Sequence, residues 1–178
     1  PIIPVGYMLM QTGLIDRLSN LKVIGWMSLI FGILLYISDK SKITNKIYPN
    51  FNTKSAIIFG LFQVIALIPG VSRSGITITA GRFLKFNRFD SAKISFFLAI
   101  PAIGATSFLG LYDIYKEGSD ELNFLALIAI IFSFIFSYIT IALFLNFIRT
   151  FSLKIFVIYR IILSLVLLSP CLLQGECY

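Results

Sequence analysis

The sequence predicts an all-α integral membrane protein. Of its 178 residues, 58% are hydrophobic and only 13% are charged, and the mean hydropathy is +0.93. A soluble domain carries roughly a quarter charged residues. The few charges also separate long uncharged runs, which is the pattern of membrane helices joined by short loops. Together these observations argue against a soluble globular domain and against a disordered chain.

Four apolar stretches have the length of membrane helices, and a fifth is shorter. The four predicted spans are residues 23–38, which is a short one, 94–112, 122–148 and 155–172. Residues 1–15 are also uncharged, but as a helix they cover only about 22 Å of a hydrocarbon core roughly 30 Å thick. We therefore expect a partial N-terminal helix, a sequence that begins partway through it, and a single membrane domain over residues 1–178.

Residues 55–84 predict a different element, a re-entrant helical hairpin. A helix that begins near Ser55 meets Pro69 and Gly70 after about 15 residues, and the second helical run, roughly 75–84, is only about 15 Å long. Neither arm spans the membrane comfortably. We expect residues 69–74 to form the tip at membrane depth, where irregular backbone must be buried in protein or line a cavity.

The basic residues predict which side of the membrane each loop occupies. Eleven Lys and Arg residues fall on one side, Arg82, Arg88, Lys93 and Arg160 among them, and three fall on the other. The first side should be cytoplasmic, with Arg88 and Lys93 as topology determinants. The same loops account for the net charge of +7, which therefore gives no reason to expect nucleic-acid binding.

Several chemistries are missing from the sequence. There is no His, so a His-based triad, metal site or general base has no basis in these residues. Cys171 and Cys177 are too few for a cysteine zinc site, and we expect free thiols. We also expect phenylalanines such as Phe132, Phe134 and Phe136 to face lipid or to pack between helices.

The predicted hairpin tip is the one segment that suggests a chemical site. Arg73 stands between Ser72 and Ser74 in otherwise apolar sequence, and a buried arginine in a membrane protein is costly and usually functional. Its guanidinium stays charged and binds phosphate through two parallel hydrogen bonds. The eight acidic residues all lie in predicted loops or the tail, so a ligand or sequence outside this chain would balance Arg73.

The neighbours of Arg73 fit the same ligand. Ser72, Ser74 and Thr77 offer hydroxyl donors, while Gly70 and Gly75 allow close approach of the backbone. Ser72 or Ser74 would also cap the second helix, whose free N–H groups attract anions. The predicted phosphate-binding set is therefore Gly70, Ser72, Arg73, Ser74, Gly75 and Thr77.

Four other polar residues allow two interpretations each. Gln63 could support the site or bind a neighbouring helix through its amide. The Thr79 hydroxyl is expected to bond back to its own helix rather than to a ligand. Tyr159 and Arg160 are expected to anchor a cytoplasmic helix end at the membrane interface rather than to act in catalysis.

The run Pro69-Gly-Val-Ser-Arg-Ser-Gly-Ile-Thr77 resembles the signature of the undecaprenyl-diphosphate phosphatase family, the bacitracin-resistance integral membrane type. The resemblance extends over about residues 2–169. Further matches are Ile3-Pro4, Phe62-Gln63, Ala92, Ser95-Phe96, Pro101, Gly104-Ala105 and Tyr159-Arg160.

The resemblance implies hydrolysis of undecaprenyl diphosphate to undecaprenyl phosphate and inorganic phosphate, which recycles the cell-wall lipid carrier. It implies a bacterial inner-membrane protein with two re-entrant hairpins that meet in the membrane and open outward. It also implies a polyprenyl diphosphate substrate, bacitracin resistance and dependence on a divalent cation, usually Mg²⁺. Arg73 would neutralise the diphosphate, with Ser72, Ser74 and Thr77 on its oxygens, and Ser72 or Ser74 could act in catalysis. The oligomeric state stays open, with a homodimer as one option.

This sequence departs from the family pattern in one respect. The family's other motif, which is rich in Glu and ends in Pro-x-Ser-Ser-Thr-Gly-His, is absent, and with it the expected metal ligands and acid–base groups. We therefore expect the C-terminal two thirds of a longer enzyme and doubt that it is active alone. The alternative is a non-catalytic transporter half that binds an anion or phospholipid at a broken helix.

Overall fold

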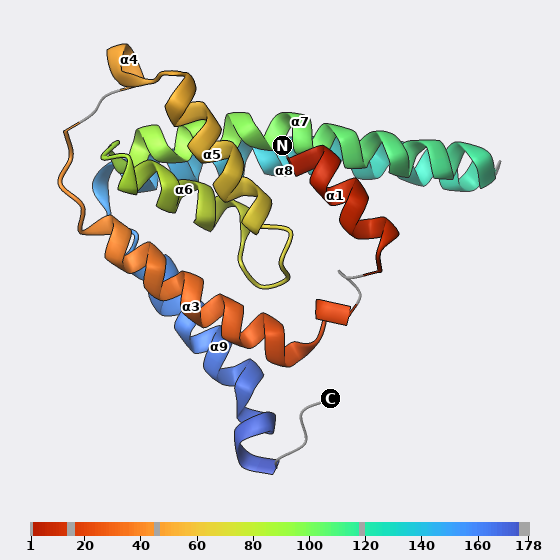
Figure 1. The fold of residues 1–178 in the computed structure, drawn as a ribbon. Coiled ribbons are helices and arrows are strands. Elements are labelled where there is room, and N and C mark those ends of the chain that lie inside the picture. Colours follow the sequence, from red (N-terminus) through yellow and green to blue (C-terminus); the bar gives the residue numbers. More distant parts are fainter. Residues whose placement is uncertain (1, 14–16, 45–46, 118–119, 175–178) are drawn as a thin grey trace. The chain divides into compact units, whose positions relative to one another are not determined.

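The computed structural model describes residues 2–13, 17–44, 47–117 and 120–174, and over these the helices confirm an all-α fold (Figure 1). Its helices are α1 (Ile2–Gln11), α3 (Leu21–Asp39), α4 (Ile47–Asn50), α5 (Thr53–Ile65), α6 (Arg73–Phe83), α7 (Arg88–Glu117), α8 (Asp120–Thr150) and α9 (Lys154–Gln174).

Three described helical segments are long and apolar enough to cross a membrane: Leu21–Asp39, Arg88–Tyr112 and Phe124–Thr150. They confirm three of the four predicted spans by length and composition. The fourth, α9, is helical as predicted and stays a predicted span. The short α1 matches the partial N-terminal helix.

The chain forms two compact units, and the larger one holds the predicted hairpin. This unit comprises Pro1–Phe96 and Ser152–Tyr178. Within it, α3 and α9 run antiparallel and pack side by side (Figure 1). Their buried residues include Leu35 from α3 and Leu168 from α9, along with small and polar residues such as Ser28 and Ser164. Helix α6 packs against α3, which places the hairpin beside this helix pair.

Two helices joined by a turn occupy the predicted hairpin, and its re-entrant placement in the membrane stays a prediction. Helix α5 begins after Asn52, whose side chain accepts a hydrogen bond from the backbone N–H of Ser55 at 2.9 Å. It ends before Pro69, and α6 begins at Arg73 and packs against α5. Buried Phe59 on α5 and Phe86, which follows the end of α6, lie with their ring centroids 6.3 Å apart and pack against each other.

The second unit, Phe97–Phe151, contains the rest of α7 and all of α8. Its described side chains are largely exposed, with Phe108 and Phe134 both at 72%. Such exposed apolar helices would be costly in water, and the cost disappears when lipid surrounds them. That Phe132, Phe134 and Phe136 face lipid or pack between helices stays a prediction. The expected thiols of Cys171 and Cys177 lie outside the side chains that the structure describes.

Candidate functional site

The hairpin tip is a tight turn pressed against the backbone of α3. Gly70 has a φ of +91°, a region that side chains disfavour. A Cβ at this position would also lie 2.5 Å from the carbonyl oxygen of Ile24. Conformation and space thus both require glycine, and the contact fixes the tip relative to α3.

The predicted phosphate-binding residues meet at the first turn of α6. Ser72 is its N-cap, as predicted, and its Oγ accepts a hydrogen bond from the Gly75 backbone N–H at 3.3 Å. Arg73 is the first residue of the helix and is half-buried, while Ser72 and Ser74 are exposed. One charged donor, two accessible hydroxyls and the positive end of a helix dipole therefore lie together.

Ser72 adopts an unusual backbone conformation, with φ 68° and ψ 112°. A non-glycine residue in such a region costs roughly 1–3 kcal/mol and persists only where the surroundings impose it. At this position the surroundings are the α3 contact at Gly70 and the start of α6. In this conformation the Ser72 hydroxyl accepts the Gly75 hydrogen bond at the helix end.

Two predicted site residues lie deeper, inside the packing of the hairpin. The Thr77 hydroxyl shares a 2.6 Å hydrogen bond with Ser95 of α7 and lies 2.9 Å from the Arg73 carbonyl, to which it donates. Gln63 on α5 is 2% exposed. Thr79 donates to the Gly75 carbonyl of its own helix at 2.8 Å, which confirms that expectation. Phosphate binding by Thr77 and a supporting role for Gln63 stay predictions.

Arg160 corrects one interpretation of the sequence. It was expected to be an interfacial anchor at a cytoplasmic helix end, but it lies inside α9 and is only 7% exposed. Its Nη2 donates to the carbonyl oxygens of Gly70 at 2.7 Å and Val71 at 2.9 Å. The sequence did hold a signal, because apolar residues flank Arg160 on both sides. Tyr159 is 62% exposed and points away from this contact.

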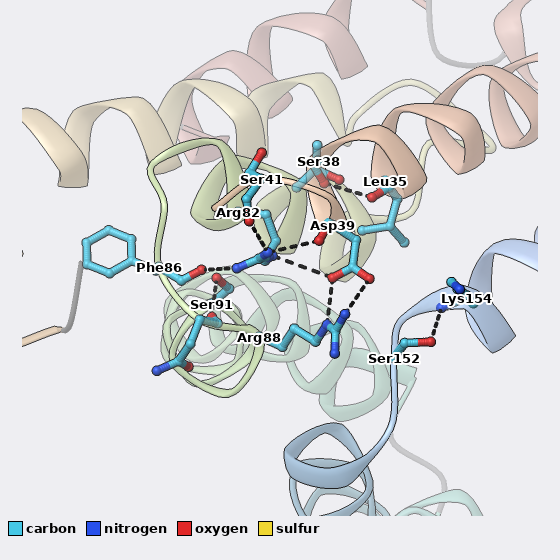
Figure 2. A network of polar contacts seen from close by, with 12 residues as sticks. Leu35, Ser38, Asp39, Ser41, Arg82, Phe86, Arg88, Ser91, Ser152 and Lys154 are labelled. Carbon is cyan, nitrogen blue, oxygen red and sulfur yellow. Dashed lines mark hydrogen bonds and ion pairs between the residues drawn. The ribbon is translucent and has the colours of Figure 1, made fainter. Parts of the chain in front are cut away.

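A second buried arginine fixes the opposite end of α6 (Figure 2). Arg82 is 2% exposed and donates to the carbonyl oxygens of Asp39, Ser41 and Phe86. Its Nε lies 3.5 Å from Asp39 Oδ1, and Arg88 binds the same carboxylate in bidentate fashion at 2.7 and 3.0 Å. Asp39 thus joins the ends of α3 and α6 to the start of α7.

These two arginines also change the count of loop charges. Arg82 and Arg160 are buried in the structure, so they are not free loop residues. The count on the predicted cytoplasmic side falls from eleven to nine (11 − 2), against three on the other side. The charge bias still favours the same side, so the predicted orientation does not change. Arg88, expected to determine topology, has a structural partner in Asp39 as well.

The described residues do not fit a divalent cation at the tip. No group of three or more Asp, Glu, His or Cys that could hold a metal ion occurs in the part of the chain that the structure describes. Of the acids whose side chains are described, Asp39 binds arginines and Asp90 accepts from Asn87 at 2.9 Å. The Mg²⁺ implied by the family resemblance therefore has no ligands among these side chains.

The fold and the site define an α-helical membrane protein whose broken helix places Ser72, Arg73 and Ser74 together at a helix N-terminus. A family comparison matches residues 1–166 to the family described as "Bacitracin resistance protein BacA". The chain belongs to this family.

Three similar proteins share the name undecaprenyl-diphosphatase. The chain is 57% identical over 168 residues to a protein of Pelagibacter ubique (strain HTCC1062) named undecaprenyl-diphosphatase, covering 94% of this chain and 65% of that protein. Proteins of the same name from Jannaschia sp. (strain CCS1) and Bifidobacterium longum subsp. infantis are 38% and 40% identical. The match covers 94% of this chain and 63% of the Jannaschia protein. For the Bifidobacterium protein it covers 93% of this chain and 58% of that protein. The chain thus spans less than two thirds of the length of these relatives.

Proposed function

We propose that this chain supplies the phosphate-binding half of an undecaprenyl-diphosphate phosphatase. The whole enzyme would hydrolyse undecaprenyl diphosphate to undecaprenyl phosphate and inorganic phosphate. The observation that carries the proposal is the first turn of α6, where Ser72, Arg73 and Ser74 lie together at a helix N-terminus. The names of the relatives favour this enzyme over a transporter half.

In this proposal the residues of the tip act mainly through electrostatics. The Arg73 guanidinium would bind two oxygens of the phosphoryl group and neutralise charge that develops as the bond to the leaving phosphate breaks. Ser72 and Ser74 would donate hydrogen bonds to the remaining oxygens. The α6 dipole adds favourable potential at the same point. No general base lies among the described neighbours of either serine, so we assign no nucleophile.

The wider setting is part of the proposal. The site would open to the outer face of the bacterial inner membrane, which agrees with the remaining bias of basic residues. The lipid tail of a polyprenyl diphosphate would stay in the bilayer while its diphosphate reaches the tip. A Mg²⁺ ion would be held by residues beyond the described side chains, and no step is assigned to it.

A chimera tests this function directly. The matched 168 residues of the Pelagibacter ubique relative are replaced by the corresponding residues of this chain, and phosphate release from undecaprenyl diphosphate is measured in detergent. We expect turnover near that of the intact relative. Arg73→Ala should lower it by about 10²–10³-fold, and Arg73→Lys should also be severely impaired, because an ammonium lacks the planar fork.

The matched control is Lys154→Ala, which removes an exposed positive charge at the start of α9 and should leave turnover unchanged. A monodisperse chimera that releases no phosphate would refute the proposed function. Normal turnover in Arg73→Ala would refute the role of Arg73 alone.

A further inference from the structure

Arg160 is built into the hairpin tip from another helix. Its Nη2 bridges two consecutive carbonyls, those of Gly70 and Val71, immediately before the strained Ser72. Its Nη1 lies against the first turn of α6, 3.0 Å from where a Cβ on Gly75 would stand, and Ser72 Oγ is 3.3 Å from the same point. The guanidinium therefore sits directly behind the proposed phosphate site.

The charge of Arg160 is not balanced by the described part of the chain. Nη1 is buried and has no hydrogen-bond partner there. Among described side chains, Asp39 is bound by Arg82 and Arg88, and no carboxylate forms an ion pair with Arg160. A buried guanidinium that keeps its proton and lacks a counter-charge is costly, and an anion nearby would reduce that cost.

We propose that Arg160 is a positioning residue that also selects for a diphosphate group. Through Nη2 it fixes the backbone that orients Ser72 and Arg73. Through its unbalanced charge it adds a second positive centre behind the α6 N-terminus. The inference rests on the proposed function, because it takes the hairpin tip as the phosphate site.

The charge leads to a specific consequence for ligand choice. Coulomb attraction scales with the charge of the ligand, so the Arg160 charge favours a diphosphate over a monophosphate. Loss of the tip hydrogen bonds alone would loosen Ser72 and Arg73 and weaken both ligands by a similar factor. The ratio of the two affinities therefore separates the electrostatic role from a purely structural one.

The experiment measures binding of inorganic pyrophosphate and inorganic phosphate to this chain in phosphatidylcholine nanodiscs by calorimetry. Arg160→Gln removes the charge and keeps an amide donor on a shorter side chain. It should weaken pyrophosphate binding by about tenfold or more and phosphate binding by only about threefold. Arg160→Lys keeps the charge with a single donor nitrogen, so it should bind both more weakly and keep the wild-type ratio.

Lys154→Gln is the matched control, since it removes an exposed charge from the same helix six residues away. It should leave both affinities unchanged. Three outcomes would each overturn the inference. The first is a wild-type ratio of the two affinities in Arg160→Gln, and the second is a loss of affinity in Lys154→Gln equal to that in Arg160→Gln. The third is no pyrophosphate binding by the unaltered chain. If Arg160→Gln does not fold, a changed ratio in Arg160→Lys would overturn it.

Hydrolysis is scored separately in the chimera. Pyrophosphate binding that depends on Arg160, combined with no hydrolysis, would refute the proposed enzyme and leave the Arg160 assignment standing. Hydrolysis in the chimera, combined with an affinity ratio that does not depend on Arg160, would support the proposed enzyme and refute the Arg160 assignment.

Discussion

Asp39→Asn should destabilise the larger unit more than any other exchange of a single described acid for its amide. The Asp39 side chain is 6% exposed and is shared by Arg82 at 3.5 Å and Arg88 at 2.7 Å. The variant keeps the shape of the side chain and one acceptor oxygen but removes the negative charge. Arg82, at 2% exposure, would then keep its carbonyl partners and lose its counter-charge.

The expected loss in the free energy of unfolding is about 3 kcal/mol. Removal of one partner of a buried ion pair costs roughly 3–5 kcal/mol, because the other charge stays buried. The lower end applies here since Arg82 retains three carbonyl acceptors. Arg88 contributes less, because its side chain is 35% exposed and can turn to solvent.

The assay is unfolding in mixed micelles, followed by the fluorescence of Trp26, the single tryptophan, which lies on α3. Asp90→Asn is the matched control, because Asp90 lies outside this network, and it should cost less than about 1 kcal/mol. Arg88→Met should cost about 1 kcal/mol. A loss for Asp39→Asn no larger than that of the control would show that the carbonyls alone stabilise Arg82.

Three further substitutions test the backbone of the hairpin. Lys85 has a φ of 65° just after α6, so Lys85→Gly should stabilise the unit by about 0.5–1 kcal/mol in the same assay. Gly70→Ala should cost at least about 3 kcal/mol, because its Cβ would meet the Ile24 carbonyl oxygen and its φ is positive. Ser72→Gly should be about 1 kcal/mol more stable than Ser72→Ala, because both lose the cap hydroxyl and only glycine relieves the strain.

The controls for these variants use the same positions. Lys85→Ala removes the charge without relieving the positive φ, so it should not stabilise. An equal gain from alanine and glycine would assign the effect to charge. Tolerance of Gly70→Ala would mean that the tip can withdraw from α3. Equal stability of the two Ser72 variants would show that the conformation of Ser72 carries no strain.

The hairpin shows which structural features can be predicted from local sequence. Pro69 and Gly70 break the helix wherever they occur, and serine caps a helix through its own hydroxyl. Both effects act over a few residues, so the break, the cap and the gathering of Ser72, Arg73 and Ser74 could be predicted. Thr77 could be placed on the right helix, but its bond to Ser95 on α7 depends on how two helices pack.

Arg82 and Arg160 show where the prediction failed. A basic residue near the end of an apolar run has the same local pattern whether it faces the headgroups or a neighbouring helix. Arg160 donates to carbonyls 89 and 90 residues away, and Arg82 to carbonyls 41 and 43 residues away. No periodicity or capping pattern encodes such distances.

The sequence alone determined the helical membrane class, three of the spans, the hairpin and the residues at its tip. The physical reason is that hydrophobic length, helix breaking and capping are local properties of the chain. Only the tertiary structure decided which charges are buried, that α3 leaves no room for a side chain at Gly70, and that Arg160 lies behind the α6 N-terminus. Those features arise from packing between segments distant in sequence, where each contact depends on the placement of whole helices.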